Sequence, residues 1–262
     1  MIADLFHRRL GTGTPVIILH GLFGSGDNFG TIGKALSQTH DVLLVDQRDH
    51  GRSPHTDRIT YPLMAEDAHA LVTADKSGRS ADIGLRNIVL VGHSMGGKTA
   101  MFFAQRWPEL VKQLVIIDMG PREYPISNQA PIIEALITSD LANKTSRKEV
   151  EQHLARYVPE PGVQQFLMKS LSWETPERLG WRFNVPVIAR DIGDILAATP
   201  PDTVRTPTLF IRGGQSDYIT RADVPAIKEQ FPNSRIETIG FAGHWVHAQA
   251  PEEVLALIHS VA

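Results

Sequence analysis

The chain has 262 residues, no cysteine, and 26 basic against 29 acidic residues, which give a formal net charge of −3 at pH 7. The basic residues are scattered without a run or stripe, which argues against a nucleic-acid-binding surface. The lack of cysteine excludes disulfides, thiolate metal sites and a cysteine nucleophile, and it fits a reducing compartment.

Length and hydropathy favour one α/β domain with an inserted segment. A chain of this size buries one substantial core, and it lies near the upper size of an undivided domain. Residues 1–9 contain no apolar stretch of signal-peptide length, and no later run approaches the roughly 20 apolar residues of a membrane span. We therefore expect a soluble cytoplasmic protein that does not bind membranes.

Short apolar runs rich in β-branched residues recur along the chain, with helical patterns between them. Continuous hydrophobicity is typical of parallel strands covered by helices on both faces. The segments 32–36 and 64–72 have apolar residues at helical spacing. The predicted fold class is α/β, with a mostly parallel central sheet and helices on both faces. The runs that predict its strands are 16–19, 42–45, 88–91, 114–117 and 209–211.

The alternation of strands and helices stops for almost ninety residues after the fourth run. This stretch has prolines at both ends, and its aromatic residues make it too apolar for a disordered linker. We predict a helical cap, residues 121–204, inserted into a core formed by residues 1–120 and 205–262. Its expected helices lie at 132–137, 150–157 and 163–171.

The sequence Gly92-His93-Ser94-Met95-Gly96-Gly97 directly follows the apolar run 88–91. A serine between two glycines, where a strand ends and a helix begins, indicates a nucleophile elbow. A serine hydroxyl needs a base to take its proton, and histidine suits this role because its pKa lies near working pH. His244, on a glycine-flanked loop after the strand-like segment 235–239, is the candidate base.

The third member of such a constellation is a carboxylate that orients the histidine. Asp217 follows the run 209–211 and gives the chain order Ser, Asp, His. Asp118 ends the run 114–117, beside the strand that precedes Ser94. The residues leave both aspartates open as the acid.

Two backbone N–H groups are expected to hold an oxyanion. Met95 begins the helix after the elbow, and Leu22 lies on the glycine-bounded loop after the first apolar run, with Phe23 as the alternative donor. A phosphate-binding loop is disfavoured because Gly24-Ser25-Gly26 lacks a following GKS or GKT.

The remaining candidates concern metals and the substrate pocket. His244 and His247 are three residues apart, but no nearby third ligand completes a metal site, so we expect neither metal nor cofactor. Aromatic side chains are expected to wall an apolar pocket for a small-molecule substrate. The pocket candidates are Phe23, Trp181, Tyr218 and Trp245.

The HG after the first long strand, the GHSMGG elbow and the GHW before the last helix resemble the α/β-hydrolase-fold serine hydrolases over the whole length. More narrowly, residues 46–54, 92–98, 181–187 and 243–248 resemble the small bacterial YbfF-like esterases. The resemblance implies hydrolysis of short carboxylic esters or acyl thioesters by a serine, aspartate and histidine triad without a cofactor. The general fold pattern favours Asp217 as the acid, whereas the narrower family favours Asp118.

Other functions remain open at this point. A thioesterase, a lactonase and a hydrolase of activated C–C bonds share the same fold and elbow. Fold alone does not determine function, so a non-catalytic ligand-binding protein is an alternative of another class. The sequence makes no prediction of oligomeric state.

Overall fold

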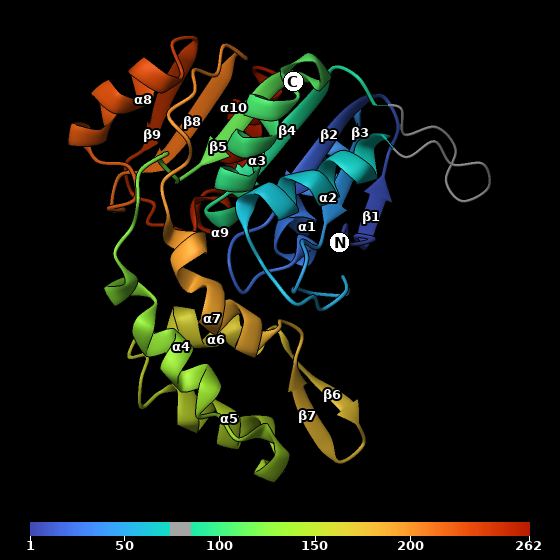
Figure 1. Ribbon diagram of the computed structural model, residues 1–262, viewed down its shortest axis with the longest axis vertical. Coiled ribbons are helices and arrows are strands. Elements are labelled where there is room, and N and C mark those ends of the chain that lie inside the picture. Colours follow the sequence, from blue (N-terminus) through green and yellow to red (C-terminus); the bar gives the residue numbers. More distant parts are fainter. Residues whose placement is uncertain (74–84) are drawn as a thin grey trace.

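The computed structural model describes residues 1–73 and 85–262, and its centre is a seven-stranded sheet (Figure 1). The strand order is β1-β3-β2-β4-β5-β8-β9. β1 pairs antiparallel with β3, and the other neighbours in this sheet pair in parallel. The strands are β1 (His7–Leu10), β2 (Thr14–Leu19), β3 (His40–Val45), β4 (Ile88–His93), β5 (Val111–Ile117), β8 (Thr208–Gly213) and β9 (Ser234–Ile239).

This arrangement confirms the predicted mostly parallel sheet, and each of the five apolar runs lies within a strand. β1 was not predicted, because its sequence HRRL is polar and only partly buried at the sheet edge. An edge strand buries less apolar surface than a central one, so continuous hydrophobicity does not mark it.

Helices cover both faces of the sheet. α1 (Gly30–Leu36), α10 (Pro251–His259) and the short α9 (Val246–Gln249) pack on the face that includes Val16 and Ile18. α2 (Tyr61–Thr73), α3 (Met95–Arg106) and α8 (Val224–Gln230) pack on the face that includes Ile17 and Leu19. Successive strand residues therefore enter opposite cores, which explains the unbroken apolar runs.

Residues 121–204, which we call the cap segment, connect β5 to β8 and lie to one side of the sheet (Figure 1). They form α4 (Ala130–Ile137), α5 (Arg147–Leu154), α6 (Pro161–Met168), β6 (Leu171–Thr175), β7 (Arg178–Trp181) and α7 (Val185–Leu196). Short 3₁₀ helices complete the described elements: η1 (Gly26–Phe29), η2 (Pro108–Leu110), η3 (Ile126–Asn128), η4 (Leu141–Asn143) and η5 (Arg221–Asp223).

Two expected helices of the cap segment end earlier than predicted. The helix predicted over 150–157 corresponds to α5, which ends at Leu154. The pattern predicted a helix over 163–171, whereas α6 ends at Met168 and Leu171 begins a hairpin strand opposite Trp181. The guanidinium of Arg147 donates to the carbonyls of Met168 and Leu171, at 2.6 Å each. These carbonyls are thereby satisfied outside a helix, which allows the chain to leave helical geometry here. No helix in the described ranges has both the length and the apolar character needed to cross a membrane.

Candidate active site

Ser94 stands at the turn between β4 and α3 with φ 53° and ψ −121°, a region that non-glycine residues rarely adopt. The flanking glycines make this turn possible. A Cβ at Gly92 would lie 2.2 Å from the carbonyl oxygen of Gly96, and one at Gly96 would lie 2.2 Å from that of Leu19. Backbone at this distance leaves no room for a side chain, so the turn requires both glycines and presents the hydroxyl of Ser94 at its tip.

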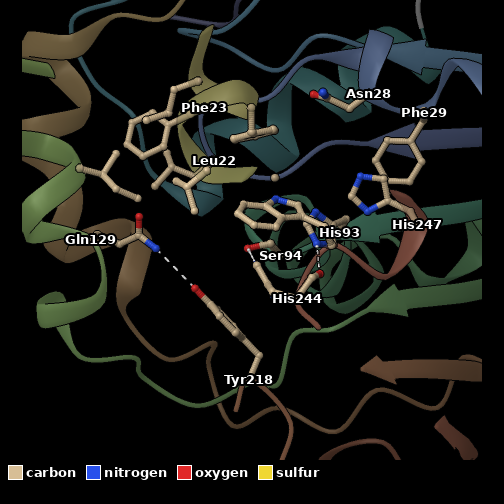
Figure 2. A pocket seen from close by; sticks show the side chains of 16 residues that line it. Leu22, Phe23, Asn28, Phe29, His93, Ser94, Gln129, Tyr218, His244 and His247 are labelled. Atoms are coloured by element: carbon tan, nitrogen blue, oxygen red, sulfur yellow. Dashed lines mark hydrogen bonds between the residues drawn. The ribbon is translucent and has the colours of Figure 1, made fainter. Parts of the chain in front are cut away.

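His244 lies between Ser94 and Asp118 (Figure 2 shows the serine and the imidazole). Its Nε2 is 3.0 Å from Ser94 Oγ, and its Nδ1 is 2.8 Å from Asp118 Oδ2. A carboxylate oxygen accepts, so Nδ1 holds the proton and Nε2 is free to accept the serine proton. Hydroxyl, imidazole and carboxylate thus form one continuous hydrogen-bonded chain.

The carboxylate of Asp118 is completely buried and held by further donors. The N–H of Gly213 donates to Oδ1 at 2.9 Å, and the hydroxyl of Ser216 donates to Oδ2. Like Ser94, Asp118 has a positive φ, 49°. This strain at the end of β5 turns the side chain toward His244, and the donors hold it in one orientation.

The second candidate acid, Asp217, lies elsewhere. Its side chain is exposed, and its backbone carbonyl accepts from the guanidinium of Arg122 at 3.0 Å. The loop that contains it sends the side chain of Ser216, not that of Asp217, toward Asp118. The structure therefore brings Asp118 to the histidine and leaves Asp217 at the surface.

Two aromatic rings fix the orientation of His244. The ring of Tyr218 stacks on the imidazole with centroids 3.7 Å apart and planes 14° apart. In addition, Nε2–H of His93 donates to the carbonyl of His244 at 2.9 Å, and burial holds the pKa of His93 well below its usual value. His244 is thus restrained through both its ring and its backbone.

The loop after β2 passes close to Ser94. A Cβ at Gly21 would lie 3.1 Å from that of Ser94. The N–H of Phe23, the alternative oxyanion donor, already donates to His50 Nε2 at 3.1 Å. Hydrogen bonds among the described residues leave the N–H groups of Leu22 and Met95 without an acceptor. These two groups are therefore available to a bound anion.

Two buried, neutral histidines hold this loop in place. His20 Nε2 accepts from the N–H of Gln47 at 3.0 Å, and its Nδ1–H donates to the carbonyl of Gly21. His50 accepts from Phe23 and donates through Nδ1–H to the carbonyl of Arg48 at 2.9 Å. Burial lowers the pKa of His20 to about 4 and that of His50 to about 3.

We expect acid to destabilise the protein through these histidines. Below their usual pKa of about 6.5 they take up protons in the unfolded chain but stay neutral in the fold. Each therefore removes about 1.4 kcal/mol of stability per pH unit as the pH falls from about 6.5 toward the folded pKa. Urea unfolding at pH 7.0, 5.5 and 4.5 measures this loss. His50→Asn should make the free energy of unfolding less dependent on pH, whereas His55→Asn, at an exposed histidine, should not. A free energy of unfolding that does not change with pH would contradict this expectation.

Two cavities meet at Ser94. The larger, of about 60 Å³, includes His244 in its wall, and the smaller, of about 20 Å³, does not. Leu22, Gln129 and Tyr218 line both, and the amide of Gln129 faces the hydroxyl of Tyr218 at 3.4 Å (Figure 2). The other apolar walls of the larger cavity are Phe23, Phe29, Ile132, Val163, Phe166, Leu167 and Trp245. Those of the smaller are Tyr61, Met95, Met119, Tyr124, Ile195 and Leu196.

The pocket candidates thus have different positions. Phe23, Tyr218 and Trp245 line the larger cavity. The structure places Trp181 within the apolar interior of the cap segment instead, stacked on Phe183 with its indole N–H donating to Ser139 Oγ at 3.2 Å. Trp181 lines neither of the two cavities at Ser94, which corrects its prediction as a pocket residue. In the sequence, an aromatic residue of the cap segment shows the same pattern whether its side chain faces a cavity or the interior of the cap.

Sequence reasoning missed Ser216 and Gln129. Ser216 precedes Asp217 directly, but only the turn geometry shows which of the two points inward. Gln129 precedes α4 and has no sequence signal. Among residues 1–73 and 85–262 no group of three or more potential ligands is arranged to hold a metal ion.

Comparisons with known proteins agree with this architecture. The sequence pattern of the α/β-hydrolase fold family matches residues 14–251. Esterase YbfF of Escherichia coli is 34% identical over 94% of this chain and 91% of that protein. The sn-1-specific diacylglycerol lipase ABHD11 of Danio rerio is 39% identical over 97% of this chain and 80% of that protein. A solved structure of a marine microorganism esterase is 38% identical with a TM-score of 0.93, covering 99% of this chain and all of that one.

Proposed function

Because this chain belongs to the α/β-hydrolase fold family, we propose that it is a serine esterase that hydrolyses short-chain carboxylic esters through an acyl-enzyme on Ser94. The observation that supports this most directly is the hydrogen-bonded chain from Ser94 through His244 to Asp118, with distances of 3.0 and 2.8 Å. Nucleophile, base and orienting acid lie within hydrogen-bond reach, as acyl transfer requires.

The first half of the reaction forms the acyl-enzyme. Ser94 Oγ attacks the ester carbonyl while His244 Nε2 takes the hydroxyl proton, and Asp118 stabilises the imidazolium that results. The carbonyl oxygen becomes an oxyanion and accepts from the N–H groups of Leu22 and Met95. His244 then donates the proton to the leaving alcohol, and the C–O bond of the ester breaks.

The second half returns the enzyme to its starting state. A water molecule takes the place of the alcohol beside His244, which accepts one of its protons as the oxygen attacks the acyl carbon. The same two N–H groups hold the second oxyanion. Collapse of this intermediate releases the carboxylic acid, and His244 returns the proton to Ser94.

The two cavities accommodate the two parts of the ester. The leaving oxygen has to lie within reach of His244, and only the larger cavity includes His244 in its wall. We therefore assign the alcohol part to the larger cavity and the acyl part to the smaller. The smaller cavity has about 20 Å³, against about 60 Å³ for the larger. We therefore expect the smaller cavity to favour short acyl chains.

Hydrolysis of p-nitrophenyl esters with acyl chains from two to sixteen carbons tests the proposal. We expect kcat/KM to peak at the two- to four-carbon acyl groups and to fall by about tenfold or more at eight carbons, because the longer chain does not fit the smaller cavity. The zebrafish relative is named a diacylglycerol lipase. A peak at long acyl chains would contradict the short-chain assignment and favour a glyceride substrate.

Two variants provide the control for this series. Met119→Ala enlarges the smaller cavity, so it should raise the relative rate on longer acyl chains. Phe166→Ala enlarges the larger cavity and should leave the acyl preference unchanged while relaxing the preference for the alcohol. The reverse pattern would show that the acyl and alcohol parts are exchanged.

A further inference from the structure

Lys98 lies in α3, four residues after Ser94, and its side chain is completely buried. Its ammonium donates to three backbone carbonyls: that of Arg122 at 2.8 Å, that of Leu196 at 3.2 Å, and that of Ala197. The nitrogen also lies 4.9 Å from the ring centroid of Tyr124, a cation–π distance. Among the described residues, its hydrogen bonds are to backbone carbonyls only.

The three carbonyls come from the two segments that join the cap segment to the sheet. We call residues 119–124 the outgoing hinge, which follows β5, and residues 195–199 the returning hinge, at the end of α7. The hinges also bind each other: the N–H of Tyr124 donates to the carbonyl of Leu196 at 3.0 Å, and that of Thr199 to the carbonyl of Pro121 at 2.8 Å. Lys98, in the helix α3 that begins directly after Ser94, therefore donates hydrogen bonds to both hinges.

The same hinges form much of the wall of the smaller cavity. Met119 and Tyr124 of the outgoing hinge and Ile195 and Leu196 of the returning hinge line it, together with Ser94. A shift of either hinge relative to α3 therefore changes the space beside the nucleophile. The bonds from Lys98 act against such a shift.

Without Lys98, its carbonyls would lose a buried, charge-assisted donor. The carbonyl of Leu196 would keep the N–H of Tyr124, but those of Arg122 and Ala197 would be left without a donor away from water. Unpaired buried carbonyls are unfavourable, and the hinges reduce this cost by separating until water reaches them. The ammonium is itself costly to bury: desolvation, and to a smaller extent the charge of Arg122, lowers the pKa of Lys98 to about 7. An apolar residue would avoid that cost but would bond neither hinge.

We propose that Lys98 is a specificity-determining positioning residue: by bonding the carbonyls of both hinges, it keeps the smaller cavity too short for long acyl chains. The inference rests on the proposed esterase function, and in particular on the assignment of the acyl part to the smaller cavity. Lys98 does not touch the reacting atoms. It acts through the position of the hinges.

The test compares Lys98→Met, which keeps a long apolar side chain without donors, with Lys34→Met at an exposed lysine of α1. We expect the ratio of kcat/KM for p-nitrophenyl octanoate to that for the acetate to rise about tenfold in Lys98→Met, as when a pocket loses its discrimination by size. Hydrogen exchange at the amides of Tyr124 and Thr199 should accelerate, because these amides join the hinges. Lys34→Met should change neither readout.

Tyr61→Phe keeps the test decisive if Lys98→Met does not fold. This variant removes only the hydroxyl that donates to the carbonyl of Ile195 at 2.5 Å on the same wall, and it should shift acyl preference in the same direction by a smaller factor. The inference is overturned if Lys98→Met folds but leaves both the acyl-chain preference and the hydrogen exchange of the hinge amides unchanged. It is also overturned if Lys98→Met is unfolded and Tyr61→Phe leaves the acyl-chain preference unchanged. Failure of the esterase proposal looks different: the wild type then hydrolyses no ester of the series, while hydrogen exchange still reports on the hinges.

Discussion

Ser94→Ala should reduce the turnover of p-nitrophenyl acetate by about 10⁵–10⁶-fold, the size of effect seen when the nucleophile of a serine hydrolase is removed. The alanine leaves His244 and both oxyanion donors in place but gives the ester carbonyl no attacking oxygen on the protein. Residual turnover would come from water held beside the donors. Steady-state release of p-nitrophenol measures the effect.

The matched control is Ser127→Ala, at an exposed serine of η3 in the cap segment. It should retain activity within a few-fold of the wild type. Circular dichroism and the urea midpoint establish that both variants are folded. A folded Ser94→Ala variant that keeps more than about a hundredth of the wild-type turnover would place the nucleophile elsewhere, because the oxyanion donors alone do not supply so much.

Asp118→Asn should reduce turnover by about 10⁴-fold. The amide of asparagine donates where the carboxylate accepts, so it favours the histidine tautomer that has its proton on Nε2. That tautomer has no lone pair for the proton of Ser94. The imidazolium also loses its negative partner, now 2.8 Å away. Steady-state turnover across pH 6 to 9 measures the change.

Asp217→Asn is the control for this variant. Its side chain is exposed and its carbonyl bond to Arg122 involves only the backbone, so turnover should stay within a few-fold of the wild type. A large loss in Asp217→Asn with little loss in Asp118→Asn would reverse the assignment of the acid. Equal, small losses of turnover in both variants would show that neither aspartate orients the histidine.

Much of the sheet was predictable because its strands are buried on both faces. Val16 and Ile18 enter one core while Ile17 and Leu19 enter the other, so the whole run is apolar and stands out in the sequence. The motifs between these strands predicted both the fold family and the resemblance to YbfF-like esterases, which the family match and the relative from Escherichia coli confirm. The edge strand β1 has no such signal.

The acid was not predictable from the residues alone. Asp118 and Asp217 both follow a strand of the sheet, and both are short carboxylates on a loop. Their difference arises from backbone geometry: the positive φ of Asp118 turns its side chain inward, while the loop after β8 directs Ser216 inward and Asp217 outward. Dihedral angles of this kind depend on packing around the turn, which a local pattern does not record.

Lys98 had no signal either, since a lysine in the first turns of a helix is usually exposed. Its carbonyl partners are 24, 98 and 99 residues away in the chain, so only the folded arrangement of both hinges reveals them. For Trp181 the sequence did give a signal, but it suggested the wrong place. Its aromatic ring suggested a pocket, but contacts with Phe183 and Ser139 place it inside the cap segment.

The most direct test of the proposed function is covalent labelling with a fluorophosphonate, followed by peptide mass spectrometry of the folded protein. The reagent phosphonylates a serine whose proton is removed by a neighbouring base, and it forms a stable analogue of the acyl-enzyme. We expect one label per chain, on the peptide that contains Ser94, with labelling slowed by short-chain esters and strongly reduced in Asp118→Asn. A folded protein that hydrolyses esters while Ser94 stays unlabelled would contradict this expectation.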